Sequence, residues 1–261
     1  MHFIVCIKQV PNTIDVDIDA RTGTLKREGV ESIINPFDEF AIEEGVRLKE
    51  RTGGKTTVIT MGPPQAESAL REALARGIDR GILITDRAFA GADTWATAYT
   101  LARAVQTVGA YDLIICGKQA SDGDTAQVGP GVAEMLDIPH AAYVKNIDDI
   151  ENGSIRVERM MEDGHDLIEM PLPALITVVK EINVPRPPSL RGTLAARKAV
   201  IEKWDAARIN AAAGNTGLTG SPTQVIRIFN PPPRRGGEML TGSVEEMAEG
   251  LVDRLKKVKI S

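Results

Sequence analysis

The residues best suited to chemistry lie between Gln119 and Leu136, in the stretch QASDGDTAQVGPGVAEML. This stretch follows the apolar run YDLIICGK and passes into an apolar helical pattern, so it joins a predicted strand to a predicted helix. A helix start with free main-chain amides binds anions, and glycines let a pyrophosphate approach the backbone. We therefore expect the N–H groups around Gly123, Thr125 and Ala126 to bind a phosphate.

The acids of this stretch suit a different task, because carboxylates repel phosphate. Residues 124–127 have the D-x-x-Q form of a capping box, in which Asp124 accepts from the Gln127 amide and Gln127 reaches back. Pro130 then falls in the early helix, where its cost is small. The carboxylates are also suited to accept hydrogen bonds from ribose hydroxyls. The simpler alternative for the whole stretch is an Asp-capped helix whose small residues pack on a sheet.

The elements expected to position this stretch alternate from the N-terminus to about residue 145. HFIVCIKQV, KTTVITMG, RGILITD and YDLIICG are continuous apolar runs of strand length. Helical segments such as NPFDEFAIEEGVRLKERTGG lie between them. The alternation predicts an α/β fold with a parallel, doubly wound nucleotide-binding sheet covered on both faces. Ligands bind beyond the carboxyl ends of such strands, here residues 8–12, 61–64, 85–87 and 117–124.

Two lysines near these strand ends, Lys8 and Lys118, are candidates to face an anion. A solvated side chain is the simpler expectation for each. The other strand-end residues have equally simple alternatives: Asn35 to Phe37 suit a helix entry, and Cys6 suits the core, with only its backbone free to touch a ligand.

The pattern changes after Ile150. GSIRVERMMEDGHDLIEM predicts an antiparallel ribbon, whereas AAYVKNI and PALITVVK predict further strands. DVDIDARTGTLKREG predicts a short hairpin, and NVPRPPSLRG predicts an extended segment without a regular helix. SVEEMAEGLVDRLKKV predicts a terminal helix with Ser243 and Glu246 as a capping box. We expect a nucleotide-binding domain at residues 1–184 and an extended C-terminal arm at residues 185–261 that packs against a partner chain.

The composition excludes several function classes. The 261 residues are 43% apolar and 26% charged, which is enough for a sizeable core, and the net charge of −5 gives no basic stripe for nucleic acid. No apolar run is long enough to span a bilayer, and no secretory signal is evident, so a cytoplasmic protein is expected. Cys6 and Cys116 lie in strand-like runs and suit buried thiols. No residues have metal-ligand spacing, and no catalytic nucleophile–base pair is evident.

The sequence resembles the beta subunit of electron-transfer flavoproteins over nearly its whole length. The resemblance is carried by VCIKQVP, NPFDEFAIEEGVRLKE, GPPQAESALREALARGIDRGILI and ICGKQASDGDTAQVGPGVAEML. VERMMEDGHDLIEMPLPALITV is similar to the family's signature segment, although Asp166 stands where glutamate or glutamine is expected. The resemblance implies a heterodimer with an alpha subunit that holds an FAD. It also implies that the flavin supplies the chemistry, with no catalytic acid or base in this chain.

The resemblance implies particular site residues in this chain. The segment INVPRPPSLRGTLAARK corresponds to the family's partner-recognition loop, and Leu190 to the leucine that anchors in the dehydrogenase. The implied nucleotide contacts come from four segments: Cys6, Asn35, Pro36, Phe37, Met61, Asp122, Gly123, Asp124, Thr125, Ala126, Gln127, Val128, Gly129, Pro130, Gly131, Val132 and Ala133.

Two types of beta subunit fit this resemblance. In the conventional type the site holds a structural AMP, its segment tends to read D-D-D-C-N-Q-T-G, and electrons pass from dehydrogenases to a quinone-linked acceptor. The present DGDTAQVGP resembles the flavin-bifurcating type, in which a second FAD replaces AMP. NADH then donates electrons, one passing to ferredoxin or flavodoxin and the other to an acyl-CoA dehydrogenase.

Alternatives from other classes are an ATP-using α/β enzyme and a nucleotide-sensing binding module. SDGDT offers carboxylates for the enzyme, but no G-x-x-x-x-G-K-[ST] phosphate loop appears in the sequence. The long prolyl arm and the terminal helix, which suit a stable partner, stand against a simple sensing module.

Overall fold

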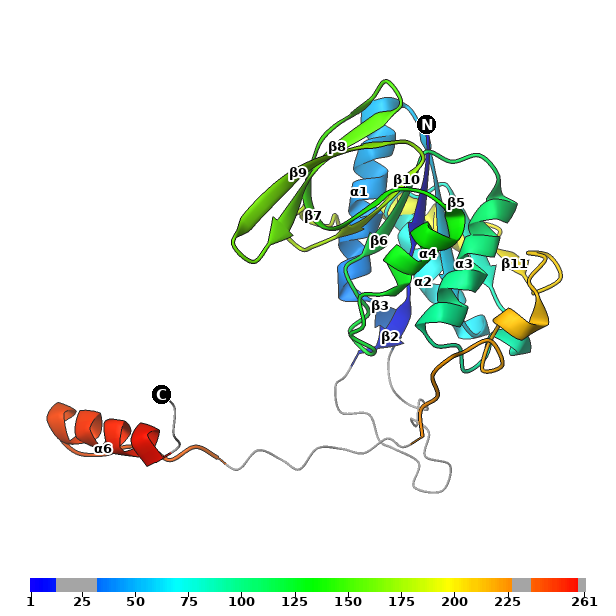
Figure 1. The fold of residues 1–261 in the computed structure, drawn as a ribbon. Helices are drawn as coiled ribbons and strands as arrows, with labels where there is room; N and C mark the ends of the chain where they lie inside the picture. Colours follow the sequence, from blue (N-terminus) through cyan, green and yellow to red (C-terminus); the bar gives the residue numbers. More distant parts are fainter. Residues whose placement is uncertain (13–31, 227–235, 258–261) are drawn as a thin grey trace. The chain divides into compact units, whose positions relative to one another are not determined.

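The computed structural model describes residues 1–12, 32–226 and 236–257 (Figure 1). The predicted hairpin around residues 21–23 and most of the prolyl connection PPPRRGG lie outside the described residues. The chain forms two compact units, Met1–Ile226 and Arg227–Ser261. The domain boundary expected at residue 185 stays a prediction.

A nine-stranded sheet forms the centre of the first unit, in the order β11-β5-β4-β1-β6-β10-β7-β8-β9 (Figure 1). The strands from β11 to β7 are parallel, and β8 and β9 continue the sheet as an antiparallel ribbon. This arrangement confirms the predicted α/β class. The strands are β1 (His2–Cys6), β4 (Lys55–Met61), β5 (Arg80–Ile84), β6 (Leu113–Gly117), β7 (His140–Glu151), β8 (Ser154–Met161), β9 (Gly164–Pro171), β10 (Ala174–Val178) and β11 (Glu202–Trp204). A separate ribbon pairs β2 (Gln9–Pro11) with β3 (Ser32–Ile34).

The strand order reverses direction beside β1. The chain runs from β1 outward through β4 to β5, and then returns to place β6 on the other side of β1. The register joins β1 to β6 from Phe3↔Leu113 to Cys6↔Cys116. The carboxyl ends of β1 and β6 therefore flank a topological switch point, which is where doubly wound sheets hold their ligands.

Helices cover both faces of this sheet (Figure 1). One face packs against α1 (Pro36–Thr52), α2 (Glu67–Ala75) and α5 (Leu190–Lys198), and the other against α3 (Thr94–Val108) and α4 (Val128–Leu136). Successive residues of β1 alternate between these two cores: Phe3 and Val5 belong to the first, and Ile4 and Cys6 to the second. Short 3₁₀ turns lie at η1 (Pro64–Ala66), η2 (Arg87–Phe89) and η3 (Ala213–Asn215).

The helix limits follow the sequence closely. Pro36 is the first residue of α1, and Gly53 ends that helix with a φ of 68°. Asp93 caps α3 by accepting from the amides of Trp95 and Ala96. One prediction is wrong: the end of NVPRPPSLRG is helical, because the Ser189 side chain accepts from the Gly192 amide and starts α5 at Leu190.

The second unit contains one helix in its described residues, α6 (Val244–Lys257). The Ser243 amide donates to Glu246 Oε2 at 2.8 Å, and the Glu246 amide donates to Ser243 Oγ at 3.2 Å. The predicted capping box is therefore confirmed.

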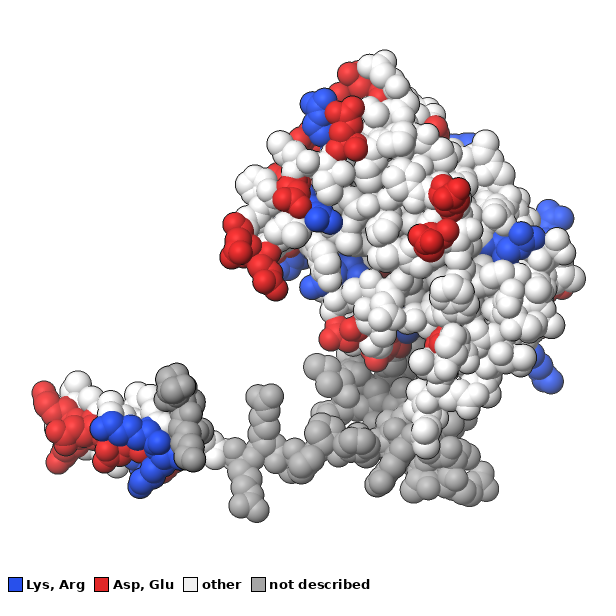
Figure 2. Space-filling model, viewed as in Figure 1, with Lys and Arg blue, Asp and Glu red and all other residues white. Residues whose placement is uncertain are grey.

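The surface shows mixed charge. On the face drawn in Figure 2, the Lys and Arg side chains of the first unit lie scattered among acidic ones and form no continuous basic area in its described part. Among the described residues, no helix has the length and apolar character needed to cross a bilayer.

Candidate functional site

The switch point between β1 and β6 is the candidate site. Cys6 and Cys116, the last or nearly last residues of these strands, are neighbours in the register and are both buried free thiols. Their mutual hydrogen bond, together with burial, raises the pKa of the Cys116 thiol. The two cysteines therefore belong to the core, as the sequence predicts, whereas a ligand contact through the Cys6 backbone stays a prediction.

A buried carboxylate on α1 joins the two strand ends. Asp38 Oδ2 accepts from the Lys8 amide at 2.6 Å, and the same carboxyl group accepts from the Gly117 amide and the Asn35 side chain. Burial raises the pKa of Asp38 to about 7, although these hydrogen bonds oppose the rise. Asp38 was not predicted from the sequence, in which its only signal is an acid on the apolar side of a helix start.

The burial of Asp38 predicts an unusual dependence of stability on pH. Its pKa is raised from 3.8 to about 7, so the folded state binds the proton that the unfolded state releases. The contribution of this group to the free energy of unfolding is therefore full below about pH 4, is lost as the pH rises towards 7, and changes little above that. A pKa shift of this size corresponds to a loss on the order of 4 kcal/mol in the free energy of unfolding.

Asp38→Asn removes this titration. The unfolding midpoint in urea is expected to rise for the variant, relative to the unchanged protein, between pH 5 and pH 8. An identical pH dependence in both proteins would show that Asp38 does not titrate in this range.

Asn35 fixes the loop that follows β6. Its Nδ2 donates to the Gln119 carbonyl at 2.8 Å, and its Oδ1 accepts from the Ser121 amide at 3.0 Å. Its own amide donates to the Lys8 carbonyl at 2.9 Å. Both polar atoms of this buried side chain are thus hydrogen-bonded to the protein backbone. In the candidate site, Asn35 therefore positions the loop. The neighbouring predicted residues Pro36 and Phe37 form the first turn of α1 beside it.

The loop itself lies on the surface. Residues 121–125 are exposed, and Asp122 accepts from Lys8 Nζ at 2.6 Å. The Asp124 amide donates to the Ala120 carbonyl, and its carboxylate accepts from Gln119 Nε2. Asp124 and Ala126 have φ values of 50° and 55°, a region that few residues other than glycine adopt.

The predicted capping box at residues 124–127 is wrong. α4 begins at Val128, and Gln127, at its N-cap position, makes no side-chain capping bond. Gln127 Oε1 instead accepts from Thr94 Oγ1 at 3.0 Å, and the Asp124 carboxylate accepts from Gln119 Nε2 rather than from a helix amide. As a result, the amides of Thr125, Ala126 and Gln127 donate no hydrogen bond within the described part of the chain.

The glycines of this stretch have two different roles. A Cβ on Gly123 would meet open space, as a phosphate-binding loop requires. A Cβ on Gly129 would lie 2.6 Å from Thr177 Cγ2, and one on Gly131 would lie 3.0 Å from Ala98 Cβ. Those two glycines therefore let α4 pack on β10 and α3, so the expectation that glycines let a pyrophosphate approach the backbone suits Gly123 alone in this stretch.

The remaining predicted residues lie around this loop or under it. Val128 and Pro130 form the partly buried first turn of α4. Val132 and Ala133 are fully buried in the core, where their side chains face other apolar residues. Met61 ends β4 and is partly buried, away from the β6 loop in sequence but at the same sheet edge.

Lys118 lies at this edge too, in a different setting. Its Nζ is 5.8 Å from the centroid of the Phe37 ring and 5.2 Å from that of Tyr143. Tyr143 has a φ of 61°, and its amide donates to Thr177 Oγ1 at 3.1 Å. Tyr143 could not be predicted from the sequence, because a bulge in the β7–β10 pairing brings it into place.

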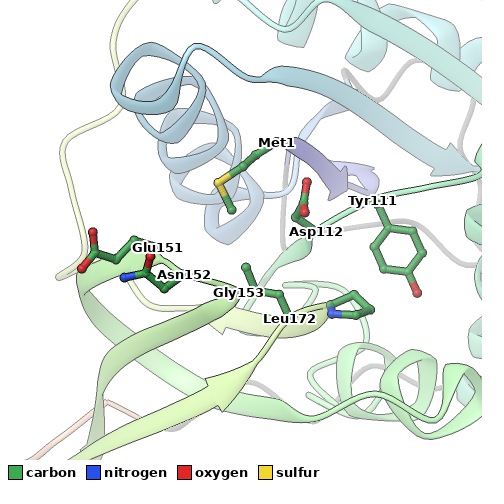
Figure 3. A pocket seen from close by; sticks show the side chains of 8 residues that line it. Met1, Tyr111, Asp112, Glu151, Asn152, Gly153 and Leu172 are labelled. Carbon is green, nitrogen blue, oxygen red and sulfur yellow. The ribbon is translucent and has the colours of Figure 1, made fainter.

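A pocket of about 350 Å³ lies at the opposite edge of the sheet (Figure 3). Met1 and Asp112 immediately precede β1 and β6, so this pocket is at the amino ends of the strands. Its lining residues are Met1, Tyr111, Asp112, Glu151, Asn152, Gly153, Leu172 and Pro173. None of them belongs to the predicted site. Among the described residues, no group of three or more His, Cys, Asp or Glu side chains is arranged to hold a metal ion.

The doubly wound sheet, with a glycine-containing loop at its switch point, defines an α/β protein of the class that binds ligands beyond the carboxyl ends of its strands. Residues 22–209 match the electron transfer flavoprotein domain. The chain belongs to the electron transfer flavoprotein family, among its beta subunits, which confirms the resemblance found in the sequence.

Three relatives illustrate this membership. The chain is 52% identical over 256 residues, 98% of each chain, to electron transfer flavoprotein subunit beta of Thermoanaerobacterium thermosaccharolyticum. It is 49% identical over 262 residues, 100% of each chain, to the caffeyl-CoA reductase-Etf complex subunit CarD of Acetobacterium woodii. It is 45% identical over 262 residues, 98% of this chain and 91% of the relative, to protein FixA of Bradyrhizobium diazoefficiens. Membership supports flavin-linked electron transfer and implies an alpha-subunit partner.

Proposed function

We propose that this beta subunit, with its alpha subunit, passes electrons from NADH by flavin-based bifurcation. The low-potential acceptor is ferredoxin or flavodoxin, and the other acceptor is an acyl-CoA dehydrogenase. The chain holds a second FAD at the switch point and works in the cytoplasm. The alpha subunit holds the other FAD.

One observation carries this proposal: an exposed loop at the switch point offers main-chain amides that have no hydrogen-bond partner among the described residues. Thr125 and Ala126 present these amides beside Gly123, where no side chain obstructs a phosphate. These residues fit the adenosine-phosphate half of FAD. The segment DGDTAQVGP supports FAD over AMP, because Gly123 stands where the conventional segment has a bulkier and acidic aspartate. The similarity to a subunit of a caffeyl-CoA reductase-Etf complex supports a CoA-ester dehydrogenase as partner.

Counting nucleotides in the intact complex tests this function. The chain is purified with its alpha subunit, and flavin and AMP are released and quantified per heterodimer. Two FAD molecules and no AMP are expected. One FAD plus one AMP would overturn bifurcation and support the conventional type, in which electrons pass from dehydrogenases to a quinone-linked acceptor. A complex without flavin that turns over ATP would favour the ATP-using enzyme.

The predicted partner-recognition residue is presented on a fixed support. Leu190 is 80% exposed at the first position of α5. Arg71 Nη1 donates to the Ala196 carbonyl at 2.7 Å, which attaches the far part of α5 to α2. Before the helix, Arg186 donates to Glu43 Oε2 at 2.8 Å. An apolar side chain on such a preorganised segment loses little entropy when it binds a partner.

Leu190→Ala is expected to lower the rate of electron delivery to the acyl-CoA dehydrogenase by about 10-fold or more, as for a central interface anchor. Flavin content stays unchanged, because Leu190 lies on α5 and not at the switch point. Val200→Ala is the matched control, since Val200 is 85% exposed but lies beyond α5. If the Leu190 variant loses flavin, or if both substitutions lower the rate of electron delivery equally, the role assigned to Leu190 is wrong.

A further inference from the structure

We propose that Lys8 binds the phosphate of the nucleotide and that Asp122 positions Lys8 for this task. The inference rests on the proposed function, because it assumes a phosphate at the loop after β6. Lys8 is not among the nucleotide contacts that the family resemblance implies, and from the sequence it was only a candidate to face an anion, with a solvated side chain as the simpler expectation.

The backbone of Lys8 is fixed on both sides. Its amide donates to Asp38 Oδ2 at 2.6 Å, and its carbonyl accepts from the Asn35 amide at 2.9 Å. From this fixed point at the end of β1, the side chain crosses the switch point, and Nζ contacts Asp122 Oδ1 at 2.6 Å. The ammonium group therefore lies next to the residue that precedes Gly123 and the unpaired amides.

Charge supports the same assignment. The loop carries Asp122 and Asp124, so a phosphate there needs a nearby cation to offset repulsion. Asp124 is already turned to Gln119 Nε2, and Asp122 is paired with Lys8. Lys118, the other lysine at this edge, lies against the rings of Phe37 and Tyr143. Among the described residues, Lys8 is thus the lysine whose ammonium group touches the loop.

The ion pair leaves Lys8 able to bind a second anion. Its side chain is 47% exposed, and an ammonium group has three N–H donors, of which one serves Asp122. A phosphate oxygen can replace a water on another donor without breaking the pair. Asp122 then limits where the flexible lysine stem places its charge, which explains why an acid stands in a phosphate-binding loop.

The test compares AMP with adenosine, which differ by the phosphate alone. The intact heterodimer, stripped of its nucleotides, is titrated calorimetrically with each ligand. Lys8→Met is expected to weaken AMP binding by about 10- to 100-fold, the usual effect of losing a charge-assisted hydrogen bond, and to leave adenosine binding unchanged. Lys8→Arg keeps the charge and restores most of the AMP affinity. Lys118→Met is the matched control and leaves the ratio of the two affinities within about twofold of its original value.

The positioning role of Asp122 has its own readout. In an Asp122→Ala background the lysine is no longer held, so Lys8→Met is expected to cost less AMP affinity than it does with Asp122 present. An equal cost in both backgrounds would overturn this role.

Other results would overturn the binding role of Lys8. Equal losses of AMP and adenosine affinity in Lys8→Met would show a structural role, and unchanged AMP affinity would show that Lys8 does not meet the phosphate. Adenosine binding also reports that each variant is folded. If the unchanged heterodimer binds neither ligand, the proposed nucleotide site fails together with this inference, whereas normal binding by Lys8→Met rejects the inference alone.

Discussion

Gly117→Ala is expected to separate α1 from β6 and to empty the nucleotide site. The added Cβ would lie 2.3 Å from Asp38 Oδ1, 2.7 Å from the Phe37 carbonyl carbon and 2.8 Å from the Asp38 amide nitrogen. Two of these are backbone atoms, so no side-chain rotation relieves the contact. The substitution is expected to lower the free energy of unfolding by about 3 kcal/mol, the upper range for overpacking a core.

Nucleotide loss accompanies the loss of stability in this variant, because Asp38 and Asn35 both reach the strand-end loops from the first turn of α1 and its N-cap. The measurements are the urea unfolding midpoint and the nucleotide content of the purified complex. Gly123→Ala is the control for stability, since its Cβ would meet no atom within 4 Å. An unfolding midpoint for Gly117→Ala equal to that of Gly123→Ala would contradict the close packing of α1 on β6.

Asn35→Ala is expected to weaken nucleotide binding, although the Asn35 side chain itself does not contact the phosphate. The substitution leaves the Gln119 carbonyl and the Ser121 amide without the partners that hold the loop at 2.8 and 3.0 Å. Leaving a buried polar group without its hydrogen-bond partner costs about 1–3 kcal/mol. If both groups lose about 1 kcal/mol each in the nucleotide-bound conformation of the loop, the affinity for the nucleotide falls by about 30-fold.

Asn183→Ala provides a matched comparison for this effect. Asn183 Nδ2 also braces α1, donating to the Phe40 carbonyl and to Glu44 Oε2, both at 3.0 Å. This variant is expected to lose stability but to keep its nucleotide affinity, measured by calorimetry on the stripped heterodimer. Equal affinity losses in the two variants would mean that Asn35 acts only through general stability.

The sequence was sufficient for features that depend on local pattern. Continuous apolar runs separated by helical segments predicted the parallel strands, and Pro36 and Gly53 marked the ends of α1. The rule that ligands bind at strand carboxyl ends placed residues 8–12 and 117–124 at one edge of the predicted sheet. The strand order, and with it the switch point between β1 and β6, is known only from the structure.

The sequence was insufficient where distant contacts decide the conformation. The D-x-x-Q spacing predicted a cap at Asp124, but the chain adopts a left-handed backbone there and the helix starts later. Lys8 and Asp122 are 114 residues apart, so no local pattern connects them. Gly129 and Gly123 looked equivalent in the sequence, yet only the packing against Thr177 shows that Gly129 serves the core.

In the proposed site, main-chain amides after β6 that have no partner among the described residues hold the phosphate of a bound nucleotide. The decisive experiment is structure determination of the purified heterodimer with its native nucleotides. Phosphate oxygens are expected about 2.7–3.2 Å from the amide nitrogens of residues such as Thr125 and Ala126. A nucleotide found only at the amino edge of the sheet, or a loop whose amides are covered by protein side chains, would contradict it.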